Sequence, residues 1–296
     1  MAEITILTPA YNRRNTLGKL YSSLLKQTEK DFRWLIVDDG STDGTEELVE
    51  KWKREKKIDI FYQRQENGGK HRALNAGIKE ITDRLTFIVD SDDYLPEDSI
   101  RIILEYHGRY ADTPGICGYS FLRFYSDGKV NTAYFPKNEE INTFLQVRIN
   151  GGIGGDKAEV FFTDVLKQYP FPEFPGEKFL PEDIVWMRMS EKYRMVHINE
   201  CVYICDYLEG GLTKSGRRMK ARSPKGMMLR SKIYLENEAV CFKVKIKMQV
   251  LYIIYSRFAG ISRKEAAEGL SKKGLFCLLY FPSIIIQKKW ESGMKR

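Results

Sequence analysis

Three carboxylates follow one another closely in the segment TFIVDSDDYL, at Asp90, Asp92 and Asp93. The apolar residues 86–89 before them predict a buried strand that ends where the acids begin. Carboxylates this close repel one another unless a positive charge lies among them, and hard cations such as Mg²⁺ and Mn²⁺ take oxygen ligands and share them with substrate phosphates. The segment therefore indicates a divalent-cation site. The alternative is a solvated acidic turn that caps a helix beginning at Pro96.

The elements that must position these acids alternate along the chain. Strands are predicted at residues 3–8, 32–37, 58–63 and 86–89, with helices between them. This alternation indicates an α/β fold with a mainly parallel sheet flanked by helices. A polar cluster follows each strand, at residues 8–12, 38–43, 68–71 and 90–93. Because ligands of such sheets bind beyond the carboxyl ends of the strands, we expect the four clusters to share one site.

The middle of the chain continues with less regular signals. Residues 115–124 and 129–135 predict two strands joined by a hairpin turn at Ser126-Asp127-Gly128. Further strands are predicted at 158–162 and 195–204, a helix begins near Pro181, and residues 209–215 (EGGLTKS) predict a loop.

Positive charge is concentrated at the end of the chain. The 296 residues carry a formal net charge of +8, yet from Lys214 onward Lys and Arg far outnumber Asp and Glu, so residues 1–213 are acidic overall. Such asymmetry indicates a polyanionic partner, either an anionic membrane surface or nucleic acid. The apolar segment 274–286 has lysines on both sides, is interrupted by Pro282, and is shorter than the ~20 residues that span a bilayer. It could lie in the membrane interface or pack back on the protein.

Five motifs occur in order along the sequence: TPAYN (8–12), VDDGSTD (37–43), NGGKHRALNAG (67–77), DSDD (90–93) and PEDIVW (181–186). With these motifs the chain resembles the family 2 glycosyltransferases of the GT-A fold, especially bacterial members that build capsule and O-antigen polysaccharides. The resemblance implies a GT-A domain over residues 1–215, with a mainly parallel nucleotide-binding sheet, followed by a basic helical region over residues 216–296.

The resemblance implies a nucleotide-sugar donor, expected to be UDP-linked, at the polar edge of the sheet. Tyr11 would offer its ring to the base and Asp39 an acceptor to an imide N–H, while Asp92 would be the main ligand of Mn²⁺ or Mg²⁺, supported by Asp90 and Asp93. The remaining implied donor-binding residues are Thr8, Pro9, Ala10, Asn12, Asp38, Gly68, Gly69, Lys70, Asn75, Asp90 and Ser91. The alternatives are ordinary packing for Tyr11 and a turn or helix cap for the two aspartates that begin VDDGSTD.

The implied reaction is an inverting transfer of one sugar. Asp183, or alternatively Glu182, would remove the proton from the acceptor hydroxyl; both acids could instead only compensate the charge of a helix N-terminus. The acceptor would be a saccharide or a polyprenyl-linked saccharide. We expect a cytoplasmic protein in peripheral contact with the anionic inner face of the cell membrane and no nucleic-acid partner, because residues 1–213 are acidic. Other interpretations are a sugar-phosphate nucleotidyltransferase and a non-enzymatic basic membrane- or nucleic-acid-binding protein.

Overall fold

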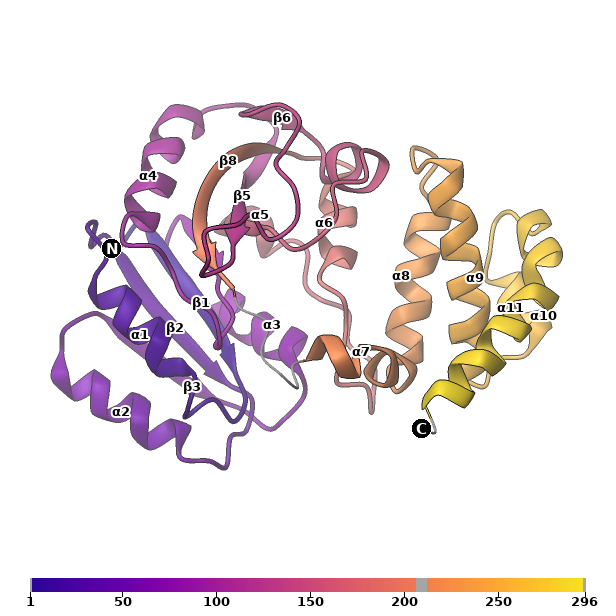
Figure 1. Ribbon diagram of the computed structural model, residues 1–296, viewed down its shortest axis with the longest axis horizontal. Coiled ribbons are helices and arrows are strands. Elements are labelled where there is room, and N and C mark those ends of the chain that lie inside the picture. Colours follow the sequence, from indigo (N-terminus) through magenta and orange to yellow (C-terminus); the bar gives the residue numbers. More distant parts are fainter. Residues whose placement is uncertain (1, 206–211, 295–296) are drawn as a thin grey trace. The chain divides into compact units, whose positions relative to one another are not determined.

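A computed structural model describes residues 2–205 and 212–294, with side chains left out for residues 212–215 (Figure 1). The chain forms two compact units, Met1–Pro170 with Met189–Asp206, and Phe171–Arg188 with Tyr207–Arg296. The loop predicted at 209–215 lies partly outside the described residues, and helix α7 (Leu212–Ala221) begins within it. The domain boundary predicted after residue 215 stays a prediction, because compact units and functional domains need not share their ends.

The first unit is built on an eight-stranded sheet in the order β3-β2-β1-β4-β7-β5-β8-β6. Strands β1 to β4 pair in parallel, and so do β5 and β8, whereas β7 and β6 run antiparallel to their neighbours. The strands are β1 (Ile4–Ala10), β2 (Phe32–Asp38), β3 (Ile60–Arg64), β4 (Leu85–Ile88), β5 (Ile116–Phe124), β6 (Glu140–Asn142), β7 (Ala158–Phe162) and β8 (Arg194–Ile204). The α/β fold with a mainly parallel sheet is confirmed.

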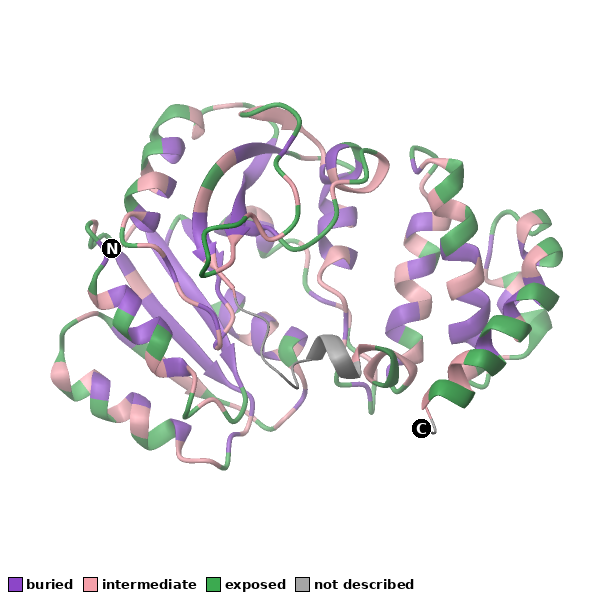
Figure 2. Cartoon of the chain, viewed as in Figure 1, coloured by how far each residue is buried: buried purple, intermediate pink, exposed green. Residues whose placement is uncertain are grey.

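Helices cover both faces of this sheet (Figures 1 and 2). The helical segments are α1 (Leu17–Leu25), α2 (Thr45–Glu55), α3 (Lys70–Glu80), α4 (Ser99–Tyr110), the π-helix η1 (Leu145–Asn150) and α5 (Thr163–Leu166).

The two faces of the sheet pack against different helices. On one face, Ile6 and Trp34 share one core with α1 and α2. Leu7 and Val37 point to the other face, where a Cβ on Gly77 of α3 would lie 2.3 Å from Leu7 Cδ1. Only glycine lets α3 approach the sheet this closely, so Gly77 lets α3 pack directly on β1 and β2.

Two predictions about strands were wrong. Residues 129–135 form no strand, and only a single bridge joins Phe124 to Val130 after the turn. The reason is that β8 lies along one side of β5 and β7 covers the other side over Gly118–Phe121, so only the last residues of β5 remain for pairing with residues 129–135. The first strand was predicted to end at residue 8, but β1 continues to Ala10, and Pro9 lies inside it opposite Val37. Pairing of β1 with β4 stops at Leu7, so the missing N–H of Pro9 costs no ladder hydrogen bond there.

The second unit is helical. Its helices are α6 (Asp183–Met189), of which only the last residue belongs to the first unit, α7, α8 (Pro224–Glu236), α9 (Phe242–Phe258), α10 (Arg263–Glu268) and α11 (Gly274–Met294). The buried carboxylate of Glu177 accepts hydrogen bonds from the backbone N–H groups of Lys225 and Gly226, both at 2.8 Å, and so caps the first turn of α8.

Helix α11 continues through Pro282, which was predicted to interrupt it. A proline removes the hydrogen bond to the carbonyl four residues earlier, here that of Leu278. Both residues lie on the exposed side of the helix, where solvent can reach that carbonyl. Within residues 2–205 and 212–294, no helix combines the length and apolar character needed to span a bilayer.

Candidate active site

The predicted donor-binding residues meet at the carboxyl edge of β1, β2 and β4. Asp39 N–H donates to Ala10 O at 2.8 Å, which joins the ends of β2 and β1. Arg13 Nε donates to Ser91 Oγ at 3.2 Å, which joins the segment after β1 to the acidic turn after β4. Lys70, the first residue of α3, forms an ion pair with Asp90 in that turn. These contacts bring four clusters that are far apart in the sequence to one edge of one sheet.

Thr8, Pro9 and Ala10 are buried within β1, and the next two residues emerge at its end. The Tyr11 side chain is 47% exposed, so it does not serve the core, and its ring is accessible to a planar ligand. Asn12 has a positive φ of 52°, a conformation that asparagine tolerates better than most residues. Its amide oxygen accepts from Thr42 N–H at 2.9 Å, which fixes the turn that follows Tyr11.

Asp38 and Asp39, the first two aspartates of VDDGSTD, are both buried and hydrogen-bonded. Asp38 accepts from Ser41 N–H and from Tyr62 Oη, each at 2.7 Å. Asp39 accepts from Gly68 N–H at 2.8 Å and Gly69 N–H at 2.7 Å.

Asp39 also accepts from the side chains of Gln65, at 2.8 Å, and Asn67, at 3.3 Å. Each of its oxygens thus has two donors, which matches the capacity of a carboxylate. The structure uses Asp39 to hold the loop before α3, and its role as an acceptor for the base stays a prediction.

The acidic turn after β4 is balanced by basic side chains. Asp90 lies against Lys70 and within 3.4 Å of Arg123 Nη1, and although burial opposes ionisation, these two charges lower the pKa of Asp90. Burial, reinforced by the charge of Asp90, raises the pKa of Asp93 to about 7. Tyr203 donates its hydroxyl to Asp93 at 2.8 Å, and the Arg123 guanidinium lies 3.9 Å from the centre of the Tyr203 ring. The turn is therefore an ordered polar network and not a solvated loop.

The chemistry of this turn fits a divalent cation that is shared with a diphosphate. Within residues 2–205 and 212–294, no group of three His, Cys, Asp or Glu side chains is arranged to hold a metal alone. Mg²⁺-type sites commonly use one or two carboxylates and complete their shell with phosphate oxygens and water. Asp90 and Asp92 are half-buried and Asp93 is buried, and Asp90 already pairs with Lys70 and Arg123, so Asp92 is the acid of this turn best placed to meet a cation.

Two further predicted donor-binding residues, Gly69 and Asn75, lie at or within α3. Gly69 precedes α3 with φ +96°, a conformation that favours glycine, and thereby aims its N–H at Asp39. Asn75 lies half-buried within α3.

The sequence analysis did not predict Arg13, Arg123 and Tyr203 as members of the polar network around the acidic turn. A detectable signal existed for Arg123, because it is a lone charge in the otherwise uncharged strand ICGYSFLRF, and buried charges need partners.

Glu182 and Asp183 belong to the second unit, at the start of α6. Asp183 forms an ion pair with Arg230 of α8, whose Nε lies 2.8 Å from both carboxylate oxygens, and Tyr234 Oη donates to Asp183 at 2.7 Å. Burial opposes ionisation, but the charge and hydrogen bonds of Arg230 lower the pKa of Asp183. This carboxylate is therefore ionised at neutral pH.

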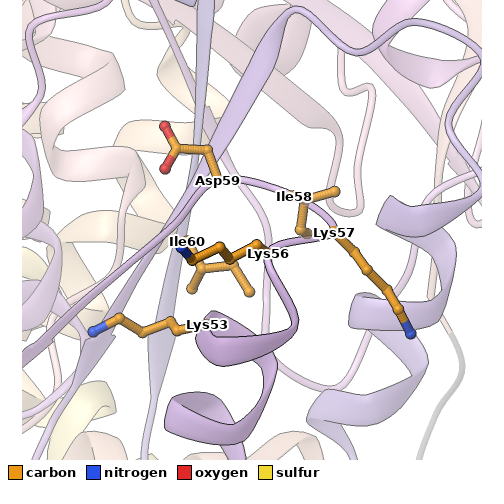
Figure 3. A pocket seen from close by; sticks show the side chains of 6 residues that line it. All are labelled: Lys53, Lys56, Lys57, Ile58, Asp59 and Ile60. Atoms are coloured by element: carbon orange, nitrogen blue, oxygen red, sulfur yellow. The ribbon is translucent and has the colours of Figure 1, made fainter.

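A surface cavity of about 430 Å³ lies elsewhere in the first unit. Figure 3 shows the side chains around it, which are Lys53, Lys56, Lys57, Ile58, Asp59 and Ile60. Because Ile60 is the first residue of β3 and the strands are parallel, this cavity lies at the amino edge of the sheet. The cavity is thus separate from the carboxyl edge of the sheet, where Asp90, Asp92 and Asp93 lie.

Residues 5–169 match the family described as Glycosyl transferase family 2. Among similar proteins, "Glycosyltransferase GlyA" of Streptococcus pneumoniae serotype 4 is 35% identical over 101 residues, covering 34% of this chain and 14% of that protein. "Poly(ribitol-phosphate) beta-N-acetylglucosaminyltransferase TarS" of Staphylococcus aureus (strain Mu50) is 29% identical over 103 residues, covering 34% of this chain and 18% of that protein. The chain thus spans less than a fifth of the length of either relative.

Solved structures share the fold at low identity. The structure of S. aureus TarS 1–349 has a TM-score of 0.65 at 18% identity and covers 99% of this chain and 92% of that chain. The structure of the mannosyltransferase PcManGT from Pyrobaculum calidifontis, in complex with GDP-Man and Mn²⁺, has a TM-score of 0.59 at 15% identity. The match covers 99% of this chain and 83% of that chain. The predicted fold and family are therefore confirmed, and the chain is a member of glycosyl transferase family 2.

Proposed function

We propose that the chain transfers one sugar, with inversion, from a UDP-sugar to a saccharide or lipid-linked acceptor during synthesis of a bacterial surface polysaccharide. The observation that carries this proposal is the polar edge of the first unit, where Asp90, Asp92 and Asp93 lie with Lys70 beside the end of β1. A donor needs a surface for its base, positive charge for two phosphates, and an open anomeric carbon. The edge supplies the first through Tyr11 and the second through Lys70 and Arg123.

Two fold neighbours support the choice of donor. Structures of S. aureus TarS 1–349 have been solved with UDP and with UDP-GlcNAc, at TM-scores of 0.62 and 0.64. For this chain we assign the base to the ring of Tyr11 and the diphosphate to the side of the edge where Lys70 and Asp92 lie. Family membership speaks against a nucleotidyltransferase and against a non-enzymatic basic protein.

The proposed cofactor is Mn²⁺ or Mg²⁺, held by Asp92 with support from Asp90 and Asp93. When bound, such a cation neutralises charge that develops on the leaving diphosphate. Lys70 can add to this from the protein, because it already lies at the acidic turn as a positive charge.

Asp183 is the proposed base. Its ionised carboxylate takes the proton from the acceptor hydroxyl as that oxygen bonds to the anomeric carbon, while the bond from this carbon to the diphosphate oxygen breaks and UDP leaves. Attack from the face opposite the leaving group inverts the configuration. Arg230 and Tyr234 act as positioning residues, because they keep the carboxylate ionised and oriented within the second unit. Glu182 remains the alternative base.

The proposed acceptor is a saccharide, free or carried by a polyprenyl lipid, and the proposed location is the cytoplasmic face of the cell membrane in peripheral contact with anionic lipid. "Teichoic acid poly(glycerol phosphate) polymerase" of Staphylococcus epidermidis, 29% identical over 153 residues, and TarS both carry names that refer to anionic surface polymers. These names support a surface-polymer role, and the basic end of the chain fits an anionic partner.

The proposal is tested by screening UDP-, GDP- and dTDP-sugars with Mn²⁺, Mg²⁺ or EDTA and following nucleotide release. We expect release from a UDP-sugar that EDTA abolishes. Asp92→Ala should lose both donor hydrolysis and transfer, whereas Asp183→Asn should retain UDP binding and lose transfer by at least ~10²-fold. Asp164→Asn, which changes an exposed first-turn acid of α5, is the matched control and should match the wild type. A fully active Asp183→Asn enzyme would remove that residue from the base role.

A further inference from the structure

Helix α11 presents large apolar side chains on its outer side. Leu278, Phe281 and Ile285 are 72%, 65% and 72% exposed. They stand three and four residues apart, so in a helix they lie on one face and form a continuous stripe. We refer to these three residues as the α11 stripe. Isolated exposed apolar residues are common on protein surfaces, but a row of three on one helix face marks a contact surface.

The inner side of the same helix carries polar residues. Ser283 and Gln287 are buried together with Phe276 and Tyr280. Ser283 Oγ donates to Leu279 O at 2.7 Å, and Gln287 Oε1 accepts from Arg257 Nε of α9 at 2.5 Å. A helix whose outer side met only water would place its polar residues outward and its leucines and isoleucines inward. Helix α11 also packs Leu279 and Ile284 inward, yet it buries two polar residues and keeps large apolar residues on its outer side, which indicates that this side is adapted to an apolar environment.

Positive charge borders the α11 stripe at both ends. Lys272 and Lys273 precede the helix, Lys288 and Lys289 follow the stripe, and all four are exposed. Lys272 lies 3.2 Å from Glu238, but both side chains are about four-fifths exposed, so this ion pair is weak. Long lysine side chains can lay their methylene groups along an apolar surface and place their charges at lipid headgroups.

A second copy of the chain fits this surface poorly. In a symmetric dimer the same patch faces itself, so the lysines that border one α11 stripe would approach those of the other. An anionic bilayer instead supplies apolar chains for the stripe and negative headgroups for the lysines. The stripe extends over only eight residues, and no described helix can span a bilayer, so α11 would lie along the surface.

We propose that the α11 stripe docks the chain onto an anionic lipid bilayer, with α11 in the plane of the membrane interface. This inference rests on the membrane contact of the proposed function and gives that contact a surface. It requires neither a particular sugar nor the assignment of Asp183 as base.

Flotation of the full chain with vesicles tests the proposal. We expect the wild type to float with vesicles of phosphatidylcholine and phosphatidylglycerol, to float much less with phosphatidylcholine alone, and to bind less as NaCl rises from ~0.1 to ~0.5 M. The double variant Phe281→Asp/Ile285→Asp should lose at least about tenfold in partitioning onto anionic vesicles. Phe281→Leu, which keeps an apolar side chain, should bind like the wild type. Phe61→Asp is the matched control, because it replaces a half-exposed phenylalanine on β3 with the same charge, and it should also float normally.

The proposal would be overturned by no flotation of the wild type, by equal flotation of the stripe variant, or by a wild-type dimer in solution that the stripe variant converts to monomer without vesicle binding. Circular dichroism of the stripe variant shows whether it is folded.

Cys277, exposed on α11 near the stripe, provides a second readout that needs no mutation in the stripe. A polarity-sensitive dye on Cys277 should shift to the blue with anionic vesicles, with Cys277→Ser as the labelling control, and an unshifted spectrum would contradict docking. Vesicle binding without UDP-sugar turnover would sink the proposed function and leave the docking surface standing.

Discussion

The residues around Asp183 determine whether its carboxylate is ionised. Its bonds to Arg230 and Tyr234 favour the ionised form, so the pKa is lowered and the proposed base is ready at neutral pH. Without the guanidinium, burial would dominate and the pKa would rise.

We therefore expect Arg230→Gln to move the acid limb of the transfer-rate profile to higher pH, with a larger loss near pH 6 than near pH 8. Lys232→Gln, which removes an exposed charge from the same helix, should leave the profile unchanged. An unmoved acid limb in Arg230→Gln would show that Arg230 does not act through the base.

Asp39 is predicted to have a structural role that the sequence motif does not reveal. Because it accepts from the N–H groups of Gly68 and Gly69, Asp39→Ala would leave buried donors without a partner. We expect a loss of about 2–4 kcal/mol in the free energy of unfolding, together with weaker UDP binding. Asp127→Ala, in an exposed turn, is the control for both measurements. If affinity falls while stability is unchanged, Asp39 serves the ligand alone.

At the scale of elements, the capping of α8 by Glu177 gives a local prediction. Glu177→Ala removes the acceptor for two backbone N–H groups at the start of α8, and should destabilise that turn by about 1–3 kcal/mol. Amide hydrogen exchange followed by mass spectrometry should then be faster in residues 224–230 than in the wild type. Glu238→Ala, a change at an exposed acid of the same unit, should leave exchange in that segment unaltered. Equal exchange in both variants would mean that the cap contributes nothing.

The sequence predicted the elements whose pattern is local. Strands β1, β2 and β4 are nearly continuous apolar runs because neighbours cover both of their faces, and such runs are legible without a structure. The missing strand at 129–135 and the short β6 could not be predicted, because they depend on which sheet edges other strands occupy. The course of α11 through Pro282 likewise depends on which side of the helix is exposed.

The candidate site was predicted in a similar way. The motifs gave the acids and Tyr11, since these follow strands directly, but the partners Arg123 and Tyr203 come from β5 and β8, more than 30 and 100 residues away from the acidic turn respectively. No local pattern links such positions. The sequence therefore identified the acids, whereas only the fold showed that basic and aromatic side chains hold them.

At the scale of the whole molecule, acidic and basic parts of the chain have separate tasks in this account. The first unit carries the polar edge proposed for the donor, and the basic second unit carries the proposed base and the α11 stripe. Because the α11 stripe and the proposed donor edge belong to different units of the chain, the stripe variant Phe281→Asp/Ile285→Asp should keep wild-type kcat and KM with a soluble acceptor. It should lose activity only when the acceptor is presented in vesicles, and a comparable loss with the soluble acceptor would contradict this separation.

The most direct measurement is a crystal structure of the chain with UDP and Mn²⁺. We predict that the uracil ring lies on Tyr11, and that the diphosphate lies beside Lys70 with the cation on Asp92. UDP found at the opposite edge of the sheet, for example in the cavity beside Lys53 and Lys56, or a cation that does not contact Asp92, would contradict the central claim.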